Sequence, residues 1–155
     1  QGRITPQFPR GIRTHYGSIN VSWYEPGSCE AFFSSDIGET IRLTAGSYNV
    51  KISTIPPTEI DGLAVRGGKE DVLEIPAPGL LMLSANTPGS GMILTQQALD
   101  PVIQFDQESF SGQYPMQPGN YTLLYRAKHA RGTIQSIKKQ FEIKSGNTTN
   151  VNIHG

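Results

Sequence analysis

The chain has 155 residues, of which 36% are hydrophobic, and its 13 Lys and Arg residues balance its 13 Asp and Glu residues. Nucleic acids and anionic membranes select a net basic surface, so a formal net charge of zero argues against either as the main partner. Apolar runs such as Leu80–Leu83 are far too short to cross a bilayer, and no direct membrane insertion is expected.

Residues 1–16 are expected to form an extended lead-in or linker. Pro6, Pro9 and Gly11 stand among three arginines there, and Pro and Gly interrupt regular structure. The stretch also lacks the apolar segment of a signal peptide. Because the chain begins at Gln1 and not at methionine, we expect it to be a processed product or a piece of a longer protein.

From residue 17 onward, apolar and polar residues alternate as in an antiparallel sheet with one buried face. This alternation predicts that Trp23 enters a core and that Tyr24 faces outward. Cys29, the single cysteine, falls in the next predicted strand and is expected to be a small buried hydrophobe. Turn signals separate the runs, and the first half is expected to contain strands near residues 18–23, 28–34, 39–44, 47–54, 59–65 and 70–75.

The second half continues this pattern, and no segment of ten or more residues carries a helical stripe. Many short strands with regular turn signals predict an all-β sandwich or barrel. The expected strands lie near residues 80–85, 91–95, 110–115, 120–127, 133–143 and 148–153, with an additional candidate at 101–105.

Three blocks of sequence recur in the same order, which indicates a duplicated unit of roughly 60 to 75 residues. The blocks align residues 17–28 with 79–90, residues 45–52 with 118–125, and residues 63–75 with 141–153. The duplication predicts two repeats, 17–78 and 79–155. We expect the repeats to pack against each other, because a unit near 60 residues is marginally stable alone.

A Gly-x-Tyr element occurs in both repeats, as Gly46–Tyr48 and Gly119–Tyr121. We interpret it as a folding device, in which the ring fills the core and the hydroxyl group finds a backbone partner near a sheet corner. The second repeat is longer than the first across residues 96–110 and in the hairpin 126–140. Such insertions usually lie in loops, where binding surfaces occur.

The order of these elements resembles the PEGA and carboxypeptidase-regulatory-like modules, which are small β-sandwiches of transthyretin-like topology. Those families share a GxLxVxS strand, a Pro-Gly turn and a later LxxGxYxVxV element. The residues that carry the resemblance are Gly17, Val21, Ser22, Pro26, Gly27, Leu43, Gly46, Tyr48, Val50 and Ile52 in the first repeat, and Gly79, Leu83, Ser84, Pro88, Gly89, Gly119, Tyr121, Leu123 and Tyr125 in the second.

The tandem arrangement is also similar to repeats that follow the von Willebrand factor A domain in bacterial envelope proteins. Residues 44–79 match the pattern of those repeats, including Pro56-Pro57 and the Pro-Ala-Pro-Gly run that ends at Gly79. The second repeat lacks both motifs, and the sequence contains no A domain. The resemblance implies two tandem antiparallel β-sandwich modules in the periplasm or on the cell surface. It also implies a non-catalytic structural or protein-interaction role within a longer von Willebrand factor A-type chain.

Catalysis would need a nucleophile with a base, paired carboxylates or a metal cluster, and the sequence shows none of these patterns. Three carboxylates in the 96–110 insertion lack the spacing of a calcium loop, and no histidine stands at metal-ligand spacing with another ligand. We therefore expect no enzyme activity, no cofactor and no metal site. The residues concerned are Asp100, Asp106, Glu108, His15, His129 and His154.

The basic hairpin 126–140 is the candidate contact surface for an acidic protein partner, although edge-strand lysines that prevent strand pairing explain the same residues equally well. An alternative function is a carbohydrate-binding accessory module of a secreted glycan-processing system, which would stack sugars on Tyr24 and Tyr114. The candidate partner contacts are Arg126, Lys128, His129, Arg131, Lys138 and Lys139.

Overall fold

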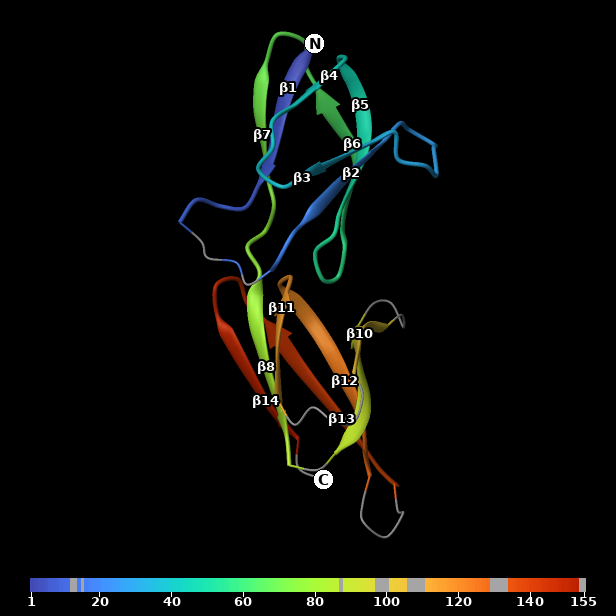
Figure 1. Ribbon diagram of the computed structural model, residues 1–155, viewed down its shortest axis with the longest axis vertical. Helices are drawn as coiled ribbons and strands as arrows, with labels where there is room; N and C mark the ends of the chain where they lie inside the picture. Colours follow the sequence, from blue (N-terminus) through green and yellow to red (C-terminus); the bar gives the residue numbers. More distant parts are fainter. Residues whose placement is uncertain are drawn as a thin grey trace. The chain divides into compact units, whose positions relative to one another are not determined.

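A computed structural model describes residues 1–11, 14, 16–86, 88–96, 101–105, 111–128 and 134–153. These ranges contain strands and turns, and they include no helix long and apolar enough to cross a membrane. The chain divides into two compact units, the first ending at Pro76 and the second beginning at Ala77 (Figure 1). The predicted all-β fold with two tandem sandwich modules is confirmed.

The first unit contains two sheets, with strand orders β4-β1-β7 and β3-β2-β5-β6. Neighbouring strands are antiparallel except for β1 and β7, which are parallel. The strands are β1 (Gly2–Gln7), β2 (Asn20–Tyr24), β3 (Phe33–Asp36), β4 (Ile41–Leu43), β5 (Gly46–Ile52), β6 (Thr58–Val65) and β7 (Glu70–Glu74).

The second unit repeats this topology strand for strand, with orders β11-β8-β14 and β10-β9-β12-β13 and a parallel pair β8 and β14. Strand β1 thus corresponds to β8, β2 to β9, and so on to β7 and β14, and both units have the transthyretin-like order. The strands are β8 (Gly79–Ala85), β9 (Gly89–Thr95), β10 (Pro101–Phe105), β11 (Ser111–Met116), β12 (Gly119–Lys128), β13 (Ile134–Ile143) and β14 (Thr148–Ile153).

The N-terminal segment corrects the expectation of a lead-in over residues 1–16. Gly2–Gln7 form the central strand of the three-stranded sheet, and Ile4 is buried in the core. A proline in a central strand normally removes a ladder hydrogen bond. Residues 3 and 7 of β1 make the backbone hydrogen bonds toward β7, so the backbone nitrogen of Pro6 points toward the β4 side of the strand. The pairing with β4 has already ended at Ile4. The missing N–H of Pro6 therefore leaves no ladder bond unmade.

The strand correspondence also corrects the first sequence block. Strand β2, within residues 17–28, corresponds to β9 and not to β8, whereas the second and third blocks align as predicted. Matching hydrogen bonds fix the start of each structural repeat. The Gly68 N–H donates to the Gln1 carbonyl, and the Gly146 N–H donates to the Pro78 carbonyl, both at 3.0 Å. Both glycines have φ near +72°, at 71° and 73°, a conformation that favours glycine.

Each unit has its own core between its two sheets. Trp23 is fully buried, and its Nε1–H donates to the Ser35 hydroxyl at 3.1 Å, while Tyr24 is half-buried on the opposite face. The predicted orientation of Trp23 is therefore confirmed. In the second unit Ile93 takes the place of Trp23, because it pairs with Leu123 as Trp23 pairs with Val50.

The loop between β2 and β3 contradicts the prediction for Cys29, which is exposed and lies outside any strand. Strand β3 begins only at Phe33. The Ser28 hydroxyl bonds the backbone of Glu30 twice, at 3.1 and 3.2 Å, and such local bonds compete with a sheet ladder. This turn keeps the segment around Cys29 out of the sheet.

Both Gly-x-Tyr elements behave as predicted. The Tyr48 hydroxyl donates to the Thr44 carbonyl and the Tyr121 hydroxyl to the Gln117 carbonyl, each at 2.6 Å and each four residues upstream. A tyrosine that bonds a carbonyl a few residues upstream also forms the corner of immunoglobulin sandwiches. The Tyr121 ring is buried and stacks on Phe141 at 5.7 Å. These tyrosines therefore hold the fold together.

Candidate binding groove

The outer face of the four-stranded sheet in the second unit carries a groove of about 750 Å³. Side chains alternate along β12, so Leu123 points into the core while Leu124 points outward and is 38% exposed. Leu124 pairs in register with Met92, and these two side chains form an apolar floor. The polar residues that line the groove are Ser90, Gln104, Arg126, Ser136 and Lys138.

The corresponding face of the first unit has an ion pair at the position where the second unit has this apolar floor. Strands β5 and β6 place Lys51 opposite Glu59, with Nζ and Oε1 3.9 Å apart. Strands β12 and β13 place Leu124 opposite Lys138, and Leu124 follows its Gly-x-Tyr element by the same interval as Lys51. Within the described ranges, neither Arg126 nor Lys138 makes an ion pair.

The two units also differ in charge. Residues 1–76 contain 7 Lys and Arg against 9 Asp and Glu, a formal charge of −2, whereas residues 77–155 contain 6 against 4, a charge of +2. Glu142 is the only acidic residue in the described part of the second unit, and it pairs with Lys144 at 3.7 Å. The second unit therefore carries a net positive charge, which favours anionic groups over cationic ones.

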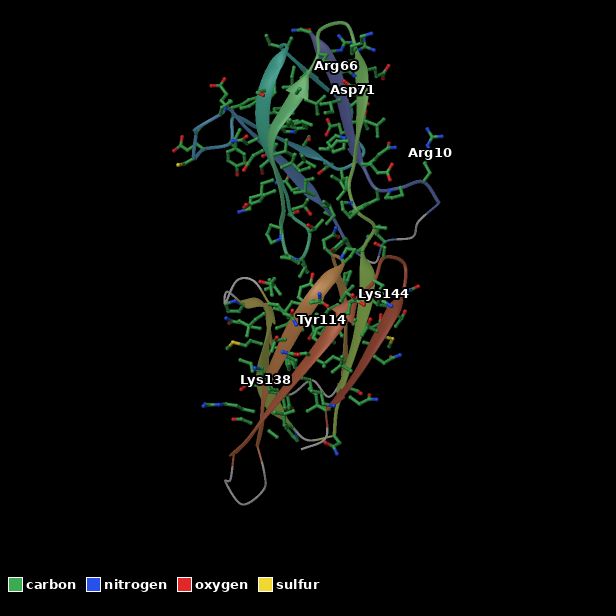
Figure 2. The ribbon with its side chains drawn as sticks, turned by 180° about the vertical axis from the view of Figure 1, so that it is seen from behind. Arg10, Arg66, Asp71, Tyr114, Lys138 and Lys144 are labelled. Atoms are coloured by element: carbon green, nitrogen blue, oxygen red, sulfur yellow. The ribbon has the colours of Figure 1, made fainter. Side chains whose placement is uncertain are left out.

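The structure brings together only part of the predicted partner contacts. Arg126 and Lys138 both line the groove, and Lys138 is labelled in Figure 2. Lys139 faces the other side of β13, where its Nζ donates to the Asn152 carbonyl of β14 and so links the two sheets. His129, Arg131 and the side chain of Lys128 lie outside the described residues.

The two tyrosines considered for sugar stacking belong to different units. Tyr24 is half-buried on the outer face of β2. Tyr114 on β11 is half-buried, its ring lies 6.5 Å from that of Phe105, and it folds back over Gly112. Tyr114 therefore packs within its own sandwich.

The apolar floor is the part of the site that the sequence reasoning missed. A signal for it exists, because the runs Met92–Leu94 and Leu123–Tyr125 interrupt the alternation of apolar and polar residues. In such a run, one apolar side chain must face outward if its neighbours face the core. Leu124 and Met92 are those outward residues.

Among the described residues, two tyrosines have raised pKa values. Burial raises the pKa of Tyr16 to about 12, and a backbone hydrogen bond with Ile55 opposes this shift. The Ile55 N–H donates to the Tyr16 hydroxyl at 3.1 Å. Burial also raises the pKa of Tyr125, whose backbone lies along the groove. At neutral pH both phenols are therefore protonated.

The described ranges bring no three His, Cys, Asp or Glu side chains together at a metal-binding distance. The lining of the groove provides apolar contact, hydroxyl and amide groups and two cations, which suits binding of an anionic and partly apolar ligand. The carboxylates and histidines considered above lie outside the described residues, and they are Asp100, Asp106, Glu108, His15, His129 and His154.

The fold defines a tandem β-sandwich protein whose second unit carries a groove on one sheet face. No protein-family model matches the chain, and no curated protein matches its sequence. Similar solved structures include GBS52, the minor pilin of the Gram-positive pathogen Streptococcus agalactiae. It is 13% identical, with a TM-score of 0.48 over 98% of this chain and 93% of that chain.

Two further structures are similar over nearly the whole chain. A candidate adhesin from Bacteroides ovatus is 10% identical, with a TM-score of 0.41 over 99% of this chain and 91% of its own. The Bacillus anthracis TIE protein is 15% identical, with a TM-score of 0.42 over 99% of this chain but only 32% of that protein. A pilin and a candidate adhesin are thus among the similar bacterial structures, and at these identities the likeness concerns the fold alone.

Proposed function

We propose that this chain is a non-catalytic protein-interaction module of a bacterial extracytoplasmic protein, and that the groove on its second unit contacts the partner. In this proposal the two PEGA-like sandwiches form part of a longer von Willebrand factor A-type envelope chain. The observation that carries the proposal is the pair of cations Arg126 and Lys138 beside the exposed Leu124. The first unit satisfies the corresponding position with its own ion pair, Lys51 and Glu59.

The register of the two cations indicates the shape of the partner. Arg126 pairs with Ser136, so Lys138 is its diagonal neighbour on the next strand, and diagonal cross-strand neighbours lie about 7–8 Å apart. Alternate residues of an extended chain lie about 6.6 Å apart on one face. Carboxylates at positions i and i+2 of an extended segment can therefore reach both cations. An apolar residue on the same face of that segment would cover Leu124.

A synthetic peptide tests the proposal directly. The probe is an extended, fluorescently labelled peptide with Glu at two alternate positions and Leu at the next, and fluorescence anisotropy measures its binding to the whole chain. We expect Lys138→Glu to weaken binding by about fivefold or more, because one attractive pair becomes repulsive and each exposed pair contributes up to about 1 kcal/mol. Raising the salt concentration from about 20 to about 300 mM should weaken wild-type binding, because exposed charges are then screened.

The matched control is Lys144→Glu, which changes the net charge of the same unit equally. Lys144 lies just after β13, and Figure 2 shows it well apart from Lys138. We expect this control to change the affinity by less than about twofold, because Lys144 does not line the groove. Equal losses of affinity in the two variants would show that net charge, and not the groove, determines binding, and this would contradict the proposal. An absence of wild-type binding would refute it as well.

A further inference from the structure

The second unit carries another groove, of about 350 Å³, on the outer face of its three-stranded sheet. Met82 on the central strand β8 is 36% exposed, and the register places Gln113 on one side of it and Asn150 on the other. In the next outward row, the Ser84 hydroxyl donates to Asn152 Oδ1 at 2.5 Å. We call this surface the amide groove.

The corresponding face of the first unit is built differently. Where the second unit has Met82, Gln113 and Asn150, the first unit has Thr5, Thr40 and Val72: Thr5 pairs with Val72, and its hydroxyl bonds that of Thr40 at 2.7 Å. Arg3, Glu70 and Glu74 lie at flanking positions of this face. The described lining of the amide groove contains no Asp, Glu, Lys or Arg. The first unit therefore forms the same sheet without an amide at any of these three positions. The fold does not require the amides of the second unit, which leaves them available to bind a ligand.

The chemistry of the amide groove fits one class of ligand. Each side-chain amide offers both donors and acceptors, as a sugar hydroxyl does. Neighbouring strands lie about 4.8 Å apart, so the backbones of Gln113 and Asn150 are about 10 Å apart across Met82. A sugar ring could lie with its C–H face on the Met82 thioether while hydroxyls at its two edges meet the amides. An ionic ligand would find no opposite charge in the described lining.

We propose that the amide groove binds a neutral saccharide, with its ring on Met82 and its hydroxyls bonded to Gln113 and Asn150. The strand that supplies Asn150 is held in place from the neighbouring sheet. The Lys139 ammonium donates to the Asn152 carbonyl, and the Thr149 hydroxyl donates to the Glu142 carbonyl at 2.9 Å. This site is separate from the groove that Arg126 and Lys138 line, which we call the cationic groove. It does not depend on the function proposed for the cationic groove.

The three methionines of the chain provide a test. Met82 lies in the amide groove, Met92 lies in the cationic groove and Met116 is fully buried in the core. Methionine-methyl NMR of the whole chain during titration with cellobiose, maltose and diacetylchitobiose should show a saturable shift at Met82, with a Kd in the range of about 1–10 mM. The methyl signals of Met92 and Met116 should stay in place.

Variants separate recognition from folding. We expect Asn150→Asp combined with Gln113→Glu to raise the Kd about fivefold or more, because each carboxylate loses the amide donors. Gln140→Glu, an exposed change on β13, adds a negative charge elsewhere and should leave the Kd within about twofold. An unshifted Met116 signal shows that each variant retains its core.

Three outcomes would overturn this inference: no saturable shift at Met82 with any of the three sugars, equal shifts at Met82 and Met92, or an unchanged Kd in the double variant. The acidic peptide should instead shift Met92 and leave Met82 in place. Failure of the amide groove to bind a saccharide can therefore be told apart from failure of the cationic groove to bind the peptide.

Discussion

The second unit packs Phe105 directly over Gly91, and a substitution at Gly91 tests this arrangement. An added Cβ would lie 2.5 Å from Phe105 Cζ and 2.8 Å from the Leu124 carbonyl oxygen. The Phe105 ring also stacks on Tyr125, with ring centres 6.0 Å apart. We expect Gly91→Val to destabilise the second unit by about 1.5–4.5 kcal/mol, through overpacking of about 1–3 kcal/mol and loss of about 0.5–1.5 kcal/mol from the aromatic pair.

The first unit shows how the loss can be rescued, because it fills the same space with the sizes exchanged. Val21 pairs with Ser35 there, whereas Gly91 pairs with Phe105 in the second unit. Adding Phe105→Ser to Gly91→Val therefore recreates the combination found in the first unit. The loss of unfolding free energy in the double variant should be smaller than the sum of the two single losses by at least about 1 kcal/mol. Such non-additivity is expected for residues in contact.

Urea unfolding must be followed separately in the two units. Trp23, the single tryptophan, is buried in the first unit, so its fluorescence reports that unit. The methyl signal of Met116 reports the core of the second. Gly17→Ala is the control, because an added Cβ there meets nothing within 4 Å. Additive losses in the double variant, or losses seen only in the Trp23 fluorescence, would refute the packing explanation.

Two tyrosines give further predictions. Tyr121→Phe removes a buried donor to the Gln117 carbonyl and should lower the unfolding free energy by about 1–2 kcal/mol. Tyr48→Phe, at the half-buried equivalent, should lower it by less. Equal losses in chemical unfolding would contradict the role of burial. Because the pKa of Tyr16 rises from 10.0 to about 12 on folding, its contribution is fully present below pH 10 and is lost as the pH rises through 12. Tyr16→Phe should therefore flatten the fall in unfolding free energy between pH 10 and 12, and a slope as steep as that of the wild type would count against this effect.

Local alternation was sufficient to predict β2, the strands from β4 onward, the inward Trp23 and the role of the two Gly-x-Tyr elements, but not β1 or the start of β3. Each of these features depends on side chains within a few residues of one another. The tyrosine hydroxyls, for example, bond carbonyls only four residues upstream. Such short-range features can be seen in a sequence because strand geometry fixes which neighbours share a face.

Strand β1 could not be found in this way, because its evidence is non-local. Pro6 argues against a central strand, and only the early end of β4 makes it acceptable there. Its parallel partner β7 begins at Glu70, far along the chain. The first sequence block was misaligned for a related reason, because a glycine-led alternating strand followed by Pro-Gly fits β2 and β8 alike.

Of the six basic residues named from the sequence as candidate contacts, the structure places Arg126 and Lys138 in the groove. Lys138 and Lys139 are neighbours in the sequence, yet they face opposite sides of β13. The register with β12 places Lys138 beside Leu124 on the outer face, while Lys139 reaches the Asn152 carbonyl. A one-residue shift in register would exchange these roles. The contact surface therefore follows from strand pairing, which composition does not reveal.

The duplication makes each unit a reference for the other. Both keep the tyrosine-to-carbonyl bond and the Gly68 or Gly146 turn, which act within each sandwich. They differ on the outer faces, where β-sheet side chains contribute little to the core. Changes at Leu124 or Asn150 therefore test the proposed sites with little expected loss of stability. The two units therefore share one frame and differ at the surfaces proposed here as binding sites.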